Sequence, residues 1–270
     1  MDNNVPARIH VIAVLVASTA ALVARAWMQS SLQDAGVEQL SASDLSYIVV
    51  LPILLLLLFP LLIKDRHFLK NLFRFNGTTA GIILAALAIG LLFRVAWWSQ
   101  LIVRISFGLQ TSDNPAAIEG PVIHYQCPTP TLMLFGIVVY SILIPVTEEI
   151  IHRGYVQTFL HARGPWIAVA ISALIFAVFH RFSGMQFALA GGIVLGIMYW
   201  LAGSLWPPLV THAVVNLTPL FTWRCMNLSW NPSIDSLPLW MPGISAIIVF
   251  LVSTALLLWL LFVKCRGLAP

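Results

Sequence analysis

Two adjacent carboxylates stand inside one of the longest apolar tracts of the chain. Glu148 and Glu149 are followed by Arg153, four residues after the second glutamate. Ionisable side chains at membrane depth are costly unless they are paired or used, so they indicate a functional site. On a helix, Glu149 and Arg153 share a face with the glutamate N-terminal to the arginine, which favours an ion pair. Glu148 points about 100° away, with His152 as its i+4 neighbour, so we expect one structural and one reactive carboxylate.

Two further polar pairs interrupt apolar helices later in the chain. Phe176 and His180 are four residues apart, and so are His212 and Asn216, which follow a proline pair at a helix start. Taken singly, His180 fits an interfacial histidine, and His212 with Asn216 fits polar side chains that bond neighbouring helices. The glutamate pair alone also fits a helix-end charge cluster at the membrane surface. Three such pairs on three helices, in a chain with only 9% charged residues, instead favour one shared site.

Together, these side chains supply a base, a proton shuttle and hydrogen-bond donors. A carboxylate with an imidazole can activate water for attack on a carbonyl group, and histidine or asparagine donors can stabilise the oxyanion that forms. No serine or cysteine stands in the context of a catalytic nucleophile. Glu148, His180 and His212 are also ordinary zinc ligands with an open fourth position, so a zinc-dependent form of the site stays open.

The composition predicts an all-α, polytopic membrane protein. Hydrophobic residues make up 60% of the 270 positions and charged residues 9%, against about a quarter charged in ordinary domains. Several apolar runs reach the roughly 20 residues that cross a hydrocarbon core. We expect about eight transmembrane helices, with approximate bounds 9–28, 47–63, 80–102, 132–163, 166–180, 185–202, 206–221 and 244–263. The whole chain, 1–270, is interpreted as a single membrane domain, in which residues 131–221 carry the three motifs.

The basic residues set the expected orientation. Eight lysines and arginines fall on the side that would hold both termini and four on the other, which favours both termini in the cytoplasm. We therefore expect an integral protein of a bacterial inner (plasma) membrane, and the net charge of +4 indicates no nucleic-acid partner. Cys127 and Cys225 fall in loops on the outer side, where a disulfide is conceivable, although unrelated thiols are the favoured interpretation.

The expected helix ends leave one geometric conflict. Glu148 and His180 both lie 15 residues, or ~22 Å of helix, from the turn at 163–165. His212 lies only six residues, or ~9 Å, into a helix that begins at the same end. Tilted helices, projection of the long helix from the membrane, or an inward dip of the 203–208 turn would each remove the conflict.

The three motifs resemble those of the CPBP family, also called the ABI or type II CAAX-protease family, of intramembrane endopeptidases. The family pattern is EExxxR, then FxxxH, then HxxxN, and the resemblance covers about residues 131–221. The six polar positions that match are, in chain order, Glu148, Glu149, Arg153, His180, His212 and Asn216. All three motifs in this order and at these spacings, each on an apolar helix, are a specific signal.

The resemblance implies a role for each motif. The first glutamate would activate water together with the histidine of the second motif. The second glutamate and the arginine would hold the geometry of the site, and the histidine and asparagine of the third motif would form the oxyanion hole. The family implies a glutamate-type protease that needs no cofactor and acts on a membrane-associated peptide or protein in the lipid bilayer, such as a prenylated or signal-type peptide. The oligomeric state stays open.

Two other classes of protein remain as alternatives. A non-catalytic membrane protein, in an immunity or scaffold role, could bind or sequester a hydrophobic peptide in the same place. A transporter could use the glutamates and histidines as a proton relay. It would need polar residues on both sides of the midplane and usually inverted repeats, and the sequence shows no repeat.

Overall fold

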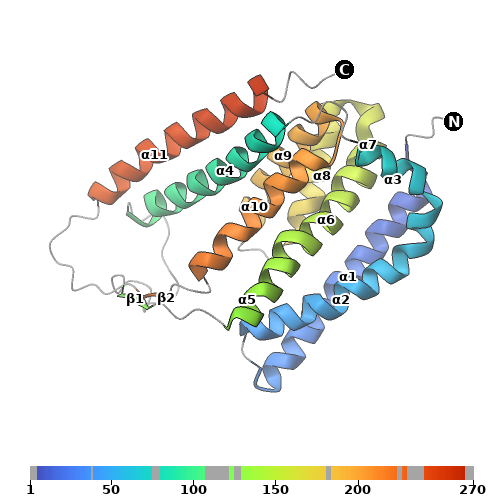
Figure 1. Cartoon of the computed structure of the whole chain (residues 1–270), viewed down its shortest axis with the longest axis horizontal. Coiled ribbons are helices and arrows are strands. Elements are labelled where there is room, and N and C mark those ends of the chain that lie inside the picture. Colours follow the sequence, from blue (N-terminus) through green and yellow to red (C-terminus); the bar gives the residue numbers. More distant parts are fainter. Residues whose placement is uncertain are drawn as a thin grey trace.

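Long apolar helices make up most of the computed structural model of this protein (Figure 1). The structure describes residues 5–37, 39–74, 80–106, 122–124, 129–180, 184–223, 227–229 and 240–264. The helical elements, in chain order, are α1 (Arg8–Asp34), α2 (Gln39–Lys64), α3 (Arg66–Leu72), α4 (Ala80–Ser106), α5 (Pro130–Ile137), η2 (Val138–Leu143), α6 (Ile144–Glu149), η3 (Ile150–Gln157), α7 (Thr158–Leu160), η4 (His161–Arg163), α8 (Pro165–Val178), α9 (Met185–Ala202), α10 (Trp206–Trp223), α11 (Trp240–Trp259) and η6 (Leu260–Lys264). This arrangement confirms the predicted helical, polytopic fold class.

The lengths and composition of the described helices bear on the number of membrane spans. Among the described residues, six helical stretches are long and apolar enough to cross a membrane: Arg8–Asp34, Ser41–Lys64, Ala80–Gln100, Met133–Arg163, Met185–Ala202 and Ile244–Phe262. The apolar helix α8 has only 14 residues, and α10 carries the polar residues of the third motif. The protein is thus an integral membrane protein, but the predicted count of eight spans is not confirmed.

The start of α1 and the end of η6 lie at the same end of the bundle (Figure 1). An even number of crossings would place them so. Which side of the membrane they face stays a prediction.

The chain from α5 to η4 forms one long helical rod, here called the central helix (residues 130–163). On one side it contacts α10, which packs on α4, and α4 packs on α11; on the other it contacts the paired helices α1 and α2. The helices α8 and α9 pack on each other, and α8 contacts η3 of the central helix. Figure 1 shows the central helix in the middle of the molecule, with α1 and α2 at one edge and α11 at the other.

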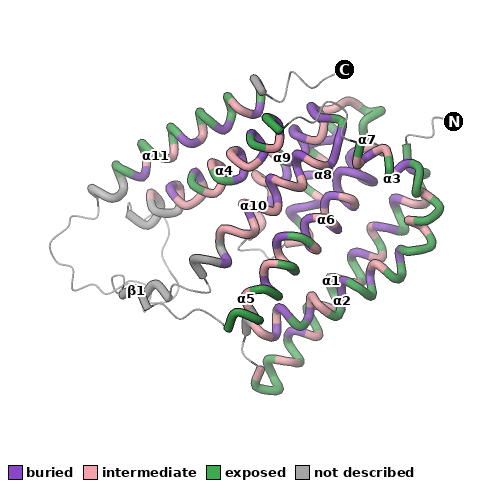
Figure 2. Tube along the Cα trace, viewed as in Figure 1, coloured by how far each residue is buried: buried purple, intermediate pink, exposed green. Residues whose placement is uncertain are grey.

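Two apolar clusters hold these layers together. The first joins α1, α2, α3, η3 and α8, and includes Val14, Leu54 and Leu205. The second joins α4, α9, α10 and α11, and includes Ile89 and Met198. Buried residues concentrate on the central helix, α8 and α9, whereas the outer faces of α1, α2 and α11 are exposed (Figure 2). The most completely packed part of the bundle therefore coincides with the part that carries the motifs.

The central helix is wound irregularly on both sides of the two site glutamates. The segments η2 and η3 are π-helical, and the six-residue α6 lies between them. Pro145, which has no backbone N–H to donate, lies two residues after the first π segment, where such an interruption of the hydrogen-bond ladder is accommodated. The proline thus coincides with a local change of winding, and the rod continues to Arg163.

The turn before α10 bears on the depth conflict expected for His212. Ser204 and Leu205 are completely buried. The Leu205 backbone N–H donates to the Leu72 carbonyl at 2.8 Å, and the Trp206 indole N–H donates to the Phe73 carbonyl at 3.0 Å. The turn is thus held beneath α3, which starts α10 well inside the bundle and brings His212 level with the glutamates. The buried turn is consistent with the inward dip, and the choice among the three alternatives stays a prediction.

The two longest expected loops are not wholly irregular. Residues 103–130 and 222–241 were both predicted as loops, yet β1 (Val122–His124) and β2 (Asn227–Ser229) pair as antiparallel strands. Period-two patterning over three residues is too short to be recognised from sequence. Cys127 and Cys225, considered above for a disulfide, lie outside the described residues.

Candidate active site

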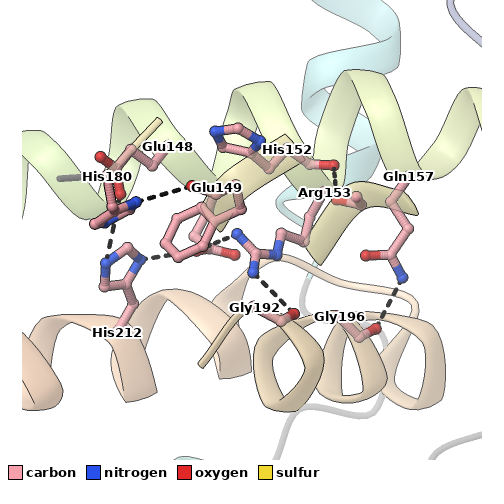
Figure 3. Close-up of polar contacts among 11 residues, drawn as sticks. Glu148, Glu149, His152, Arg153, Gln157, His180, Gly192, Gly196 and His212 are labelled. Atoms are coloured by element: carbon pink, nitrogen blue, oxygen red, sulfur yellow. Dashed lines mark hydrogen bonds and ion pairs between the residues drawn. The ribbon is translucent and has the colours of Figure 1, made fainter. Parts of the chain in front are cut away.

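Glu149 ends α6 and is fully buried, so its charge must be neutralised inside the protein. Arg153 Nη1 donates to Glu149 Oε1 at 3.1 Å, and His212 Nδ1 lies 2.8 Å from the same oxygen (Figure 3). The guanidinium of Arg153 is also fully buried, so the ion pair predicted from the i,i+4 spacing is present in the interior. Removing one member of such a pair would leave an uncompensated buried charge. Each side chain is therefore held in place by the other.

Arg153 and Gln157 connect the central helix to α9. Arg153 Nη2 donates to the Gly192 carbonyl at 3.1 Å, and Gln157 Nε2 donates to the Gly196 carbonyl at 2.8 Å (Figure 3). Both glycines lie where the helices approach closely, because a Cβ at Gly192 would stand 3.0 Å from Ala173 Cα and one at Gly196 3.1 Å from Gln157 Oε1. The position of the site arginine therefore depends on small residues in the facing helix.

His212 lies between the two glutamates. Its Nδ1 contacts Glu149, and its Nε2 lies 3.6 Å from Glu148 Oε2 (Figure 3). When Nδ1–H donates to Glu149, the Nε2 nitrogen faces the Glu148 carboxylate. A hydrogen on either Nε2 or the Glu148 Oε2 then makes the contact between these two atoms attractive. This imidazole can thus hold a proton between a buried carboxylate and a more accessible one.

The ring of Phe176 is the packing centre of the site. Its centroid lies 5.1 Å from that of His152, 4.6 Å from that of His180 and 5.8 Å from that of His212. The guanidinium carbon of Arg153 lies 4.7 Å from the same ring centroid. The aromatic residue of the second motif therefore spaces three imidazoles and one cation that come from three helices.

His180 caps the helix that carries it. Helix α8 ends at Val178, so the Phe176 carbonyl is one of the last four, which lack an intrahelical partner. His180 Nδ1 lies 2.8 Å from that carbonyl oxygen. Nδ1 must carry the hydrogen to donate this bond, which leaves Nε2 as a proton acceptor. The helix-end position expected of an interfacial histidine thus also fixes its tautomer.

Glu148 and His180 line one chamber of about 430 Å³, whose other walls include residues of α1 and α2. The Glu148 side chain is 26% exposed, whereas that of Glu149 is fully buried. A smaller cavity of about 40 Å³ is lined by His180, His212 and Asn216, so His180 borders both. The two carboxylates therefore lie in different environments, one open to a chamber and one enclosed.

Asn216 is connected to the site less directly than the other predicted residues. Its Nδ2 donates to the Tyr140 carbonyl of the central helix at 3.0 Å. An amide nitrogen carries two hydrogens, and this bond uses one of them. Thus Glu148, Glu149, Arg153 and His212 form one chain of contacts, His180 shares a chamber with the first of them, and Asn216 borders the small cavity.

The zinc-dependent form considered from the sequence requires three ligands around one ion. Within the described part of the chain, no group of three or more His, Cys, Asp and Glu side chains is arranged to hold a metal ion. The zinc set considered from the sequence, Glu148, His180 and His212, therefore does not form a ligand cluster. The Nδ1 atoms of its two histidines are engaged by Phe176 and Glu149.

Some residues of the site were missed or misplaced by the sequence analysis. Gln157 is buried and lies four residues after Arg153, so the polar face Glu149–Arg153–Gln157 was a signal that could have found it. His152 makes no hydrogen bond to Glu148, its expected neighbour; its ring lies edge-on to Phe176 and Phe179, and its carbonyl accepts a bond from Ser172. The π-helical winding of η3 changes which side chains share a face, which i+4 spacing cannot anticipate.

Fold and site together define a membrane-embedded helical protein with a largely apolar chamber into which a glutamate and a histidine project. Residues 130–218 match the family model described as type II CAAX prenyl endopeptidase Rce1-like. The resemblance drawn from the three motifs is thereby confirmed, and this segment, about a third of the chain, is similar to CAAX-type intramembrane proteases. No curated protein and no solved structure was found to match the chain.

Proposed function

We propose that this protein is a glutamate-type intramembrane endopeptidase that hydrolyses a peptide bond of a membrane-anchored, prenylated or signal-type peptide. The observation that carries the proposal is the position of Glu148 and His180, which come from different helices and line the same chamber. A carboxylate and an imidazole beside one space can share the deprotonation of a water molecule. The match of residues 130–218 to a family of CAAX-type proteases supports the same chemistry.

In the proposed reaction, Glu148 and His180 act as the general base. Water gives a proton to Glu148 or to the Nε2 of His180 and attacks the scissile carbonyl carbon, forming a tetrahedral oxyanion. The same proton then passes to the departing amine as the C–N bond breaks, so the enzyme ends in its starting protonation state. The capping bond from His180 Nδ1 to Phe176 supports this role, because in the neutral imidazole it places the hydrogen on Nδ1 and leaves Nε2 as the proton acceptor.

The remaining motif residues are proposed to hold His212 in position and to stabilise the oxyanion. Glu149 and Arg153 form the buried ion pair that holds His212 through its Nδ1. His212 presents its Nε2 toward Glu148, and a hydrogen carried on that atom can donate to the oxyanion. The second N–H of Asn216 is the other proposed donor. Each such donor contributes roughly 3–4 kcal/mol of transition-state stabilisation where it has been measured.

The catalytic core is proposed to be residues 131–221 within a single membrane domain formed by the whole chain. The chamber is walled by α1 and α2, outside the segment that matches the family. Those helices expose apolar faces, as expected next to lipid. A hydrophobic, membrane-held substrate could therefore reach Glu148 without leaving the bilayer.

Replacement of Glu148 tests the reaction. Purified Glu148→Gln protein in lipid nanodiscs should lose at least about 100-fold of its cleavage rate on an S-farnesylated peptide, the scale of general-base catalysis. His180→Ala should lose a similar factor. The matched control for the histidine is His161→Ala, because His161 is exposed in η4 and lines no described cavity of the site. Mass spectrometry of the products locates the cleaved bond.

The outcomes separate this proposal from its alternatives. Wild-type activity in Glu148→Gln would exclude the proposed base. Binding of the peptide without cleavage by any form would favour the sequestering protein. Loss of activity on addition of a chelator, with recovery on added zinc, would support the zinc-dependent form.

A further inference from the structure

A second cavity adjoins the chamber on its α1 side. It has a volume of about 360 Å³, and His180 lines both spaces. Most of the other residues that line it are polar and lie on one face of α1, among them Arg25, Gln29 and Ser30. One water in a cavity needs only ~10–15 Å³ and roughly two to four polar partners. This cavity therefore has the size and the lining to hold a group of water molecules.

The opposite face of α1 has a different character. It carries a groove lined almost entirely by apolar residues, of which Val16, Val23 and Trp27 are largely exposed. These positions recur every three to four residues, as expected of one helix face. Exposed apolar side chains on a membrane span fit the hydrocarbon of the lipid, whereas a charged residue inside a span faces the bundle interior or a water-filled cavity. Helix α1 thus separates a lipid-facing side from a polar side that points toward the site.

The cavity extends from the level of His180 toward one end of the bundle. Helix α8 has 14 residues, or ~21 Å of helix, so His180, two residues past its end, stops short of crossing a hydrocarbon core about 30 Å thick. The lining continues along α1 from Leu22 past Ser30, more than about 12 Å of helix. Ser30 is exposed and lies in the last two turns of α1, at the end of the bundle opposite to the described chain ends (Figure 1).

The proposed reaction requires such a path. Hydrolysis consumes one water for each bond cleaved, and the hydrocarbon core of a bilayer supplies none. His180, one half of the proposed base, lines the chamber, the cavity on the α1 side and the small cavity beside His212. Water that enters along the polar face of α1 would therefore reach this imidazole without crossing lipid.

We propose that the polar face of α1 forms a water-filled route, which leads from the aqueous phase at the end of α1 to His180 and supplies the water that the reaction consumes. The proposal rests on the proposed protease function and adds to it the path of the second reactant. It gives a role to residues that lie outside the three motifs and outside the segment 130–218 that matches the family.

Cysteine labelling detects water along α1 without relying on catalysis. The native cysteines to be replaced by serine first are Cys127, Cys225 and Cys265. Protein in nanodiscs is then treated with sulfonatoethyl methanethiosulfonate, an anion that does not cross membranes. Because the hydrated thiolate is the reacting form, Ala26→Cys in the cavity should label at least about 10-fold faster than Ala24→Cys in the lipid-facing groove. Leu22→Cys and Val23→Cys repeat this comparison deeper in the membrane, with the faster labelling expected for Leu22→Cys.

Reversible blocking connects the route to the reaction. Labelling leaves a sulfonatoethyl group on the cysteine as a mixed disulfide, and this group fills part of the cavity. Labelled Ala26→Cys protein should lose most of its kcat on the S-farnesylated peptide, keep its affinity for the peptide, and recover kcat when dithiothreitol removes the label. The same folded protein is measured before and after reduction, so misfolding cannot produce this pattern. Ala24→Cys protein, treated in parallel, should keep its kcat. Truncation of a lining side chain leaves the space open, so only an added group should block it.

Two outcomes would overturn the inference: equal labelling rates on the two faces of α1, or full activity of the labelled Ala26→Cys protein. Failure of the protease proposal gives a different pattern. In that case wild-type protein leaves the peptide uncut, while the faster labelling of the cavity face persists.

Discussion

The two walls of the chamber are built in contrasting ways. The motif-bearing wall, formed by the central helix, α8, α9 and α10, is densely packed, and its polar groups are joined by buried hydrogen bonds. The wall formed by α1 and α2 is looser. In the apolar stretch of α1, 22% of the residues are buried inside the protein, against 44% in the apolar stretch of the central helix. One wall therefore has the rigidity that catalytic geometry needs, and the other is better suited to vary with the substrate.

Two arginines express this contrast most directly. Arg153 is fully buried, pairs with Glu149 and bonds the Gly192 carbonyl. Arg25 borders the chamber, and among the described residues it contacts Gln29 and Tyr47 and forms no ion pair. One arginine thus holds neighbouring helices together in the motif-bearing wall, whereas the other borders the chamber and forms no ion pair with a described residue. Matched substitutions in the two walls test whether the walls differ in stability and packing as described.

The largest effect is expected for Arg153→Ala. Removing the guanidinium leaves Glu149 as a buried charge with His212 as its remaining partner, so the free energy of unfolding should fall by about 3–5 kcal/mol. Thermal and denaturant unfolding of nanodisc-held or detergent-solubilised protein measures the change. Arg25→Ala is the matched control and should cost no more than about 1 kcal/mol, because it has no ion pair to lose among the described residues. Equal losses for both variants would contradict the contrast.

A smaller effect is expected for Gly192→Ala. The new Cβ would lie 3.0 Å from Ala173 Cα, which is part of the backbone and cannot move aside cheaply. Overpacking of this kind costs about 1–3 kcal/mol, and the shift of α9 should also lengthen the bond to Arg153. Gly191→Ala tests the neighbouring position, where the nearest atom is a Phe93 ring carbon at 3.6 Å. There the higher helix propensity of alanine should leave stability unchanged or raise it by up to about 1 kcal/mol.

The sequence predicted the motif-bearing wall far better than the other. Glu149 and Arg153 are four residues apart on one helix, so local geometry alone dictated their pairing. The capping contact of His180 likewise follows from its spacing to Phe176 at a helix end. Such features depend on the near-regular rise of a helix, which sequence spacing encodes directly.

What the sequence did not predict depends on how distant segments meet. The bridging position of His212 required the turn at Leu205 to be tucked beneath α3, which no local pattern specifies. The π-helical winding around His152 altered the expected neighbours of Glu148. Arg25 was not singled out from the sequence, because nothing in its own surroundings indicates that α1 borders the chamber.

Gln157→Ala should have a moderate effect on the motif-bearing wall. Its loss removes the 2.8 Å hydrogen bond to the Gly196 carbonyl, and such bonds between membrane helices contribute about 0.6 kcal/mol on average and up to about 1.7. We expect a loss of stability in this range and a modest decrease in kcat, since the bond helps to hold α9 against Arg153. The exposed Gln33 of α1 offers the control, and Gln33→Ala should change neither quantity. A change in kcat without any change in stability would assign Gln157 a direct role in the reaction.

An effect of similarly small size is expected where the looser wall is attached to the central helix. The Tyr155 hydroxyl donates to Asp65 Oδ2 at 3.1 Å, and His10 Nδ1 of α1 lies 2.9 Å from the same oxygen. Tyr155→Phe keeps the buried ring and its edge-on contact with Phe68, and Asp65 keeps its histidine partner, so we expect a loss of about 0.5–1.5 kcal/mol. Hydrogen exchange gives the sharper readout, because weakening this network should speed exchange in α1 and leave α9 unaffected. Faster exchange spread evenly over both helices would mean that the two walls unfold as one unit, and the looseness of α1 would then lie in its packing and not in its attachment.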